Sequence, residues 1–190
     1  MTDSKALVDK ILAGNPNAFT TLVKQNERLV AQIVFRMVPS RHDREDICQE
    51  VFLKVYQNLD RFQHQAKLST WIARIAYNTS LNYIEKKRVP LYEDHSPEGE
   101  TLDDRPSNAA TPAQWTESRQ AATRLCEEID KLPVLFGTIV SLYHLQDMSY
   151  ADIGDILSLP DGTVKSYLYR ARRMLKERMI ARYNEEELCA

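Results

Sequence analysis

The chain has 190 residues, of which 43% are hydrophobic and 27% charged, and its formal net charge is −2. This composition is typical of a soluble globular protein with one or two small domains. The first residues lack the apolar run of a signal peptide, and the uncharged stretch from Leu132 to Leu145 is too short to span a bilayer, so we expect a cytoplasmic protein that is not inserted in a membrane.

Apolar residues follow helical spacing nearly throughout, so the expected fold class is all-α, with two small helical bundles. We expect helices over residues 5–12 and 18–38, and a third that begins near Asp43. The third carries Ile47, Val51, Val55 and Leu59 at a spacing of four. After a polar loop over residues 60–68, Ser69 or Thr70 is expected to cap a fourth helix that runs to Lys87.

Charge then divides the chain. Residues 61–88 hold six Lys or Arg against one acid, and residues 161–182 hold seven against two. Between them, residues 89–112 hold six acids and one base, with several prolines and no apolar periodicity. We therefore expect domains over residues 1–88 and 115–183, a flexible acidic linker over 89–114 and a frayed tail over 184–190. The two basic blocks suggest two surfaces that face a polyanion.

Residues 149–175 have the pattern of a helix-turn-helix. Val164, Leu168, Ala171 and Leu175 form one apolar stripe, and cationic or hydrogen-bonding side chains lie off that stripe. Pro160 and Gly162 are expected to break the chain between the helices, with Thr163 or Asp161 capping the second. In such motifs the second helix enters the DNA major groove. An ordinary helical hairpin with a solvated basic face remains the alternative.

Two further helices combine apolar stripes with distinctive polar faces. Asp46, Gln49 and Glu50 share a face that suits a basic partner or simply water. Residues 62–88 combine aromatic side chains, a basic end, and Asn78 and Asn82 four residues apart. This mixture suits single-stranded nucleic acid, because aromatic rings stack on bases and cations follow the backbone. Trp71 in this segment is expected to bury much of its area in the core.

In chain order the motifs are Asp-x-x-Gln-Glu-Val-Phe-x-x-Val-Tyr, Ser-Thr-Trp-Ile-x-Arg-Ile-Ala-x-Asn, Met-Ser-Tyr-x-Asp-Ile-Gly and Gly-Thr-Val-Lys-Ser-x-Leu-x-Arg-Ala-Arg. Together they resemble the extracytoplasmic-function (ECF) group of the bacterial sigma-70 family, over essentially the whole chain. The resemblance implies a factor that binds core RNA polymerase, directs it to specific promoters and helps open the DNA. It assigns sigma-70 region 2 to residues 1–88 and region 4 to residues 115–183.

The resemblance also implies roles for individual residues. It places polymerase docking on Asp46, Gln49 and Glu50. It places recognition of the melted −10 strand on the loop and helix that carry Arg61, Phe62, His64, Lys67, Trp71, Arg74, Asn78 and Asn82. It places recognition of the −35 duplex on Thr163, Lys165, Ser166, Tyr169, Arg170 and Arg173. Tyr167 departs from the family, because many relatives carry a basic residue there that contacts phosphate.

The implied partners are core RNA polymerase, promoter DNA in duplex and melted form, and an anti-sigma factor. The alternative is a free-standing helix-turn-helix regulator, which leaves the acidic helix face and the Trp/Asn helix without a role. An enzyme is not expected, because the chain lacks a Glu-x-x-His pair, a phosphate-binding glycine loop and a nucleophile motif. Cys48, Cys126 and Cys189 are isolated thiols without metal-site spacing, so we expect no metal, no cofactor and no catalytic residue.

Overall fold

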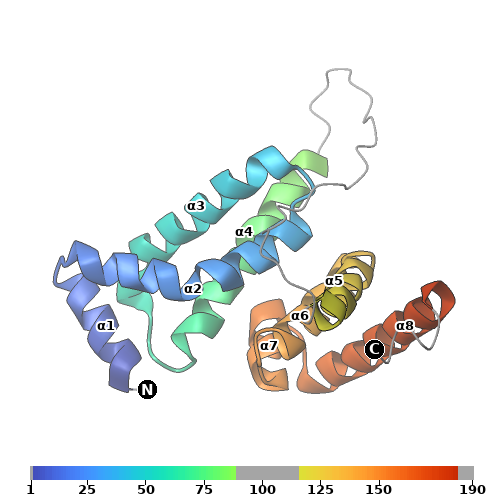
Figure 1. Cartoon of the computed structure of the whole chain (residues 1–190). Coiled ribbons are helices and arrows are strands. Elements are labelled where there is room, and N and C mark those ends of the chain that lie inside the picture. Colours follow the sequence, from blue (N-terminus) through green and yellow to red (C-terminus); the bar gives the residue numbers. More distant parts are fainter. Residues whose placement is uncertain (1, 89–115, 184–190) are drawn as a thin grey trace.

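The computed structural model describes residues 2–88 and 116–183, and every regular element within these ranges is helical (Figure 1). The N-terminal helical group consists of α1 (Thr2–Leu12), α2 (Pro16–Met37), α3 (Arg41–Gln57), the 3-10 helix η1 (Leu59–Arg61) and α4 (Leu68–Arg88). The C-terminal helical group consists of α5 (Thr116–Asp130), α6 (Val134–His144), α7 (Tyr150–Leu157) and α8 (Asp161–Arg182). The all-α expectation is confirmed. The expected linker and tail lie outside the described residues.

The N-terminal group is built around α2, which packs on α1, α3 and α4, while α3 also packs on α4. Leu22, Ile33 and Ile72 fill the space between these helices and are at most 2% exposed. Burial of each such side chain stabilises the fold by about 1.5–3 kcal/mol. The stripe predicted for α3 is confirmed for Ile47, Val51 and Val55, which are buried.

The ends of two helices differ from the sequence expectation. Helix α3 begins at Arg41, because the Ser40 side chain accepts a hydrogen bond from the Asp43 N–H, and it ends before Leu59, which lies in η1. Helix α4 begins at Leu68, so Ser69 and Thr70 lie inside it and the predicted cap is wrong. Thr70 is only 2% exposed. Its hydroxyl donates to the carboxylate of Asp152 in the C-terminal group instead of capping α4.

The C-terminal group is built around α8, which packs on α5, α6 and α7. Its centre is formed by Ile139, Ile153 and Leu168, each at most 1% exposed. The buried carboxylate of Glu128 is paired with Lys131 and Arg182, at 2.8 and 2.7 Å. A buried charge needs such partners, because an unpaired one is costly to remove from water.

The two helical groups lie side by side, with α7 against α4 and α6 against α2 (Figure 1). Neither group, as far as the structure describes it, contains a helix with the length and apolarity that a bilayer crossing requires.

Candidate nucleic-acid interface

Helices α7 and α8 form a helix-turn-helix whose first helix has a complete capping box. The Ser149 side chain accepts from the Asp152 N–H at 3.1 Å, and the Asp152 carboxylate accepts from the Ser149 N–H at 3.2 Å. These reciprocal bonds satisfy N–H groups that have no partner inside the helix.

The turn between α7 and α8 is made differently from the prediction. Ser158 takes the left-handed conformation (φ 56°), and the Leu159 N–H donates to the Gly154 carbonyl at 3.0 Å. A Cβ atom on Gly154 would lie 2.7 Å from the Leu159 carbonyl oxygen, so this close approach requires glycine. Gly162 lies inside α8 and does not make the turn. Pro160 is the N-cap and no side chain caps α8, so the predicted cap by Thr163 or Asp161 is wrong.

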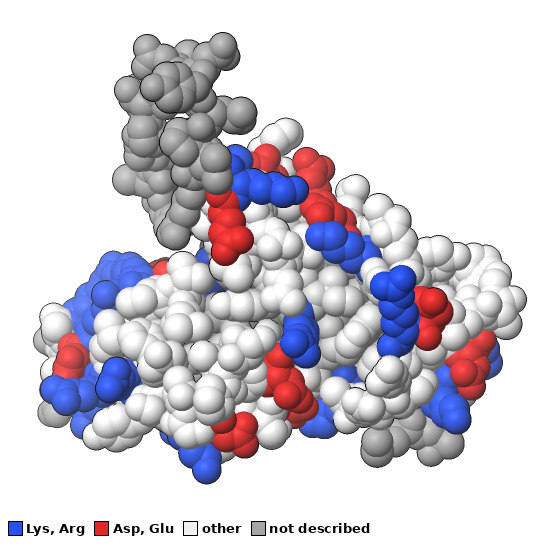
Figure 2. All heavy atoms as spheres, turned by 180° about the vertical axis from the view of Figure 1, so that it is seen from behind, with Lys and Arg blue, Asp and Glu red and all other residues white. Residues whose placement is uncertain are grey.

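Helix α8 presents a polar face on the side opposite its buried stripe. Val164, Leu168 and Ala171 are at most 1% exposed, which confirms the predicted stripe for these three, whereas Leu175 is only half-buried. The exposed residues of α8 include Lys165, Ser166, Tyr169, Arg170 and Arg173. Blue basic side chains gather at the end of the molecule where α8 lies (left in Figure 2). Five donors on one exposed helix face can reach base edges and phosphates of a duplex.

Tyr169 and Arg173 lie on this face in different surroundings. Tyr169 is 70% exposed, which is unusual for an aromatic side chain without a partner to cover it. Arg173 forms an ion pair with Glu177 at 2.8 Å. Thr163 is only partly exposed at the first turn of α8.

Aromatic side chains of α6 and α7 support the α8 face, and the sequence reasoning missed them. The rings of Tyr143 and Tyr150 stack at 5.1 Å. Lys165 lies over the Tyr150 ring at 5.4 Å, and Arg172 lies over the Tyr143 ring at 5.1 Å. Cation–π contacts of this kind hold long basic side chains in place. Tyr167 packs edge-on against Phe136, at 5.6 Å between ring centroids, and so helps attach α8 to α6.

A second polar surface runs along α4. Arg74, Asn78 and Asn82 are all exposed, and their spacing of four places them on one face. Trp71 is half-buried one turn before Arg74, and Lys67 is exposed just before the helix begins. The structure thus aligns the predicted α4 residues in one stripe of cations, amides and one aromatic ring.

The loop between η1 and α4 contains an aromatic cluster. The Phe62 ring lies 5.3 Å from Trp71 and 4.6 Å from His64. Phe62 is 8% exposed, so it anchors the loop from inside. His64 has a left-handed backbone (φ 56°), an uncommon conformation for a residue other than glycine, and Arg61 is exposed beside it.

The acidic face of α3 is exposed, as expected for Asp46, Gln49 and Glu50. Glu50 forms an ion pair with Lys54 at 2.7 Å, which offsets the repulsion between Glu50 and Asp46. Leu53 follows on the same face and is 55% exposed. The sequence reasoning assigned Leu53 no role, although an apolar side chain beside an acidic patch suits a protein partner.

A polar cluster ties the start of α3 to the end of α4. Asp43 accepts hydrogen bonds from Lys87, at 2.7 Å, and from the Tyr83 hydroxyl. The bond from Lys87, followed by that from Tyr83, holds the pKa of the Asp43 carboxyl well below its usual range. The cluster therefore links the first turn of α3 to the last turns of α4.

Comparisons with known proteins agree with this arrangement. Residues 22–89 match the family model of Sigma-70 region 2, and residues 124–175 match that of Sigma-70, region 4. The chain is 31% identical to the ECF RNA polymerase sigma factor SigW of Bacillus subtilis over 179 residues, which cover 92% of this chain and 96% of SigW. It is 33% identical to the ECF RNA polymerase sigma-E factor of Haemophilus influenzae over 183 residues, which cover 94% and 96%.

Two solved structures share the fold. The sigma factor RpoE of Bartonella quintana, in complex with the anti-sigma factor NepR, has a TM-score of 0.69 at 18% identity, covering 87% of this chain and 98% of RpoE. CnrH, in complex with the cytosolic domain of CnrY, has a TM-score of 0.65 at 20% identity, covering 94% of this chain and 97% of CnrH. From its two region matches and its full-length relatives, the chain belongs to the extracytoplasmic-function group of the sigma-70 family.

Proposed function

We propose that this sigma factor binds core RNA polymerase through α3, reads the melted −10 strand with α4 and its preceding loop, and reads the −35 duplex with α8. The observation that carries the proposal is the pair of exposed polar faces on α4 and α8, each backed by a buried stripe. Two separate faces suit two separate promoter elements. A free-standing helix-turn-helix regulator needs only the α8 face.

For the −35 element, we assign base reading to Lys165, Tyr169 and Arg170. Arg and Lys can donate to the guanine edge in the major groove. Ser166 and Thr163, nearer the start of α8, suit phosphate contacts together with the free N–H groups there. Tyr167 takes no part in this assignment, because its ring is half-buried against Phe136.

For the −10 element, we assign Asn78 and Asn82 to the bases, and Arg61, Lys67 and Arg74 to the backbone of the displaced strand. His64 is partly exposed beside the buried Phe62, where its ring can stack on an unpaired base. Phe62 and the buried part of the Trp71 ring hold the loop in position and do not contact DNA.

For docking, Asp46, Gln49 and Glu50 supply acceptors for a basic surface of the polymerase. Leu53 adds an apolar contact at the end of the same face. Complementary charge steers association, and a desolvated apolar side chain in the centre of an interface contributes much of its affinity.

We further infer a cytoplasmic protein without catalytic activity of its own, since its role is to direct the polymerase. An anti-sigma factor is its expected regulator, and this inference is supported by the complex of the similar RpoE with NepR.

The test compares binding of genomic DNA fragments by the chain alone, by core RNA polymerase alone and by both together. The proposal expects site-specific fragments to be retained only by the mixture. Tight, site-specific retention by the chain alone would instead favour the free-standing regulator.

A further inference from the structure

Two tyrosines from different helices form a stacked pair beside α8. Tyr143 lies in the last turn of α6 and Tyr150 in the first turn of α7. Their ring centroids are 5.1 Å apart and the ring planes differ by 16°. Both side chains are half-buried. Stacking gives the two rings a fixed separation, so the pair is a firm surface on which other side chains can lie.

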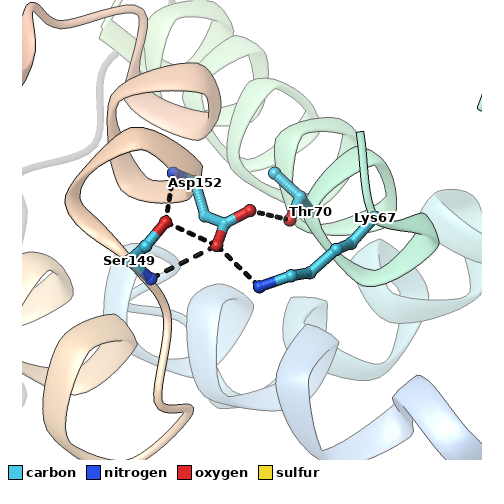
Figure 3. A network of polar contacts seen from close by, with 4 residues as sticks. All are labelled: Lys67, Thr70, Ser149 and Asp152. Atoms are coloured by element: carbon cyan, nitrogen blue, oxygen red, sulfur yellow. Dashed lines mark hydrogen bonds and ion pairs between the residues drawn. The ribbon is translucent and has the colours of Figure 1, made fainter. Parts of the chain in front are cut away.

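The first turn of α7, in which Tyr150 lies, is held by polar contacts on two sides. Ser149 and Asp152 close the capping box immediately around it (Figure 3). The Asp152 carboxylate also accepts from the Thr70 hydroxyl at 2.9 Å and from Lys67 at 3.0 Å, both in the N-terminal group. The ring of Tyr150 therefore extends from a segment of well-defined position.

Each ring of the pair carries one cation of α8. Nζ of Lys165 lies over the Tyr150 ring, 5.4 Å from its centroid, and the Arg172 guanidinium lies over the Tyr143 ring at 5.1 Å. The two cations are seven residues apart, so they share one flank of α8 and are separated by about 10.5 Å along its axis. The stacked rings bridge this distance and join the two cations in one row.

His144 also contacts the guanidinium of Arg172. Nε and Nη2 of Arg172 lie 3.1 and 3.0 Å from Nε2 of His144. Loss of hydration around the imidazole, followed by the charge of Arg172, lowers the pKa of His144, so the ring is neutral at pH 7 and Nε2 can accept. Because arginine has five N–H donors, the guanidinium keeps others for a DNA phosphate while it is held.

We propose that Tyr143 and Tyr150 are positioning residues for −35 recognition, which hold Lys165 against a base edge and Arg172 against a phosphate of the same duplex. The first residues of a recognition helix contact base edges, and a cation two turns later on its flank can meet the strand backbone. A side chain that is held before binding loses less conformational entropy when it meets DNA. This inference rests on the proposed function, because it needs α8 to lie on the −35 duplex.

The test measures how well the chain with core polymerase discriminates between a promoter fragment with an intact −35 element and one with that element scrambled. Tyr150→Leu keeps an apolar side chain but removes the ring, and should lower the discrimination about 2- to 5-fold, the value of one exposed cation–π contact. Tyr150→Phe keeps the ring and should retain the wild-type discrimination. Tyr167→Leu is the matched control, because its ring packs on Phe136, and should leave the discrimination unchanged.

A double-mutant cycle separates positioning from a general effect on the fold. In a chain that already carries Lys165→Met, Tyr150→Leu should change the discrimination by less than about 1.5-fold, because the cation that the ring positions is gone. An equal loss in both backgrounds would overturn the positioning role, since a purely structural effect does not depend on Lys165. A loss for Tyr150→Phe as large as that for Tyr150→Leu would also overturn it, because the effect would then belong to the hydroxyl.

Arg172→Met tests the second cation of the row. It should weaken binding to both fragments equally and lower the slope of log affinity against log salt concentration by about 0.9, the contribution of one phosphate contact. Tyr143→Leu should weaken binding to both fragments about 2- to 5-fold, and only while Arg172 is present. An unchanged salt slope for Arg172→Met would overturn the phosphate contact.

Failure of the proposed function gives a different result. If wild-type chain and polymerase bind the intact and the scrambled fragment equally, or bind neither, the assignment of α8 to the −35 element is overturned, and the positioning role with it. If the wild type and Tyr150→Leu discriminate equally well, the proposed function stands and the positioning role is overturned.

Discussion

Replacement of Arg170 by alanine tests the assignment of α8 to the −35 element. Arg170 is exposed on α8 and forms no ion pair with the residues that the structure describes, so its loss should change the free energy of unfolding by no more than about 0.5 kcal/mol. If it donates to a base edge, its removal weakens −35 recognition by about 1–3 kcal/mol, which is about 5- to 160-fold in affinity. The cost should therefore fall on recognition and not on folding.

The assay is transcription in vitro by the chain with core polymerase, on one promoter with its −35 element intact and on a second with that element scrambled. Arg170→Ala should lower the initial rate on the first template at limiting factor and have little effect on the second. Lys5→Ala removes one exposed positive charge from α1 and should leave both rates unchanged. An equal loss on both templates would refute base reading by Arg170, because a phosphate contact or a general charge effect does not depend on sequence.

Three further changes test the docking face, the turn and the Asp43 cluster. Asp46→Lys with Glu50→Lys should abolish co-purification with core polymerase, because it reverses the charge of the exposed α3 face. Gly154→Ala should lower the free energy of unfolding by about 1–3 kcal/mol, because its Cβ meets backbone, whereas Gly162→Ala meets open space and should be nearly neutral in the same denaturant titration. Asp43→Asn should destabilise the chain at pH 7, and the difference from wild type should shrink as pH falls below about 4.

The sign of the pH effect follows from the direction of the Asp43 shift. Its pKa is lower in the folded than in the unfolded chain, so the ionised carboxylate stabilises the fold above the unfolded pKa. That contribution is lost as pH falls toward the folded value. A constant difference between the wild type and Asp43→Asn from pH 7 to pH 3 would contradict the cluster. For docking, a charge reversal at exposed Glu27 of α2, Glu27→Lys, is the control, and normal co-purification of the α3 double variant would reject that surface.

Local periodicity predicted the helices and much of the candidate site. The stripe of Val164, Leu168 and Ala171 was sufficient to orient α8, because residues three and four apart share a helix face. The same rule placed Asn78 and Asn82 together on α4. These features depend on neighbours within one helix, which the sequence displays directly.

Helix caps and tertiary contacts were harder to predict from the sequence. Ser69 and Thr70 have the chemistry of an N-cap, but α4 begins before them and Thr70 bonds to Asp152 across the interface. Gly162 suggested the turn, whereas Ser158 accepts the left-handed conformation there. Pairings between residues far apart, such as that of Lys67 with Asp152, leave no periodic signal in the sequence. A capping Asp at the start of α7 gave no indication of a second partner.

The proposed role is tested most directly by mapping the transcription start sites that the purified chain and core RNA polymerase use on a genomic DNA library. The account predicts start sites that appear only when the chain is present and that share one −35 and one −10 sequence upstream. The same start sites without the chain, or none with it, would contradict its role as the promoter-recognition subunit.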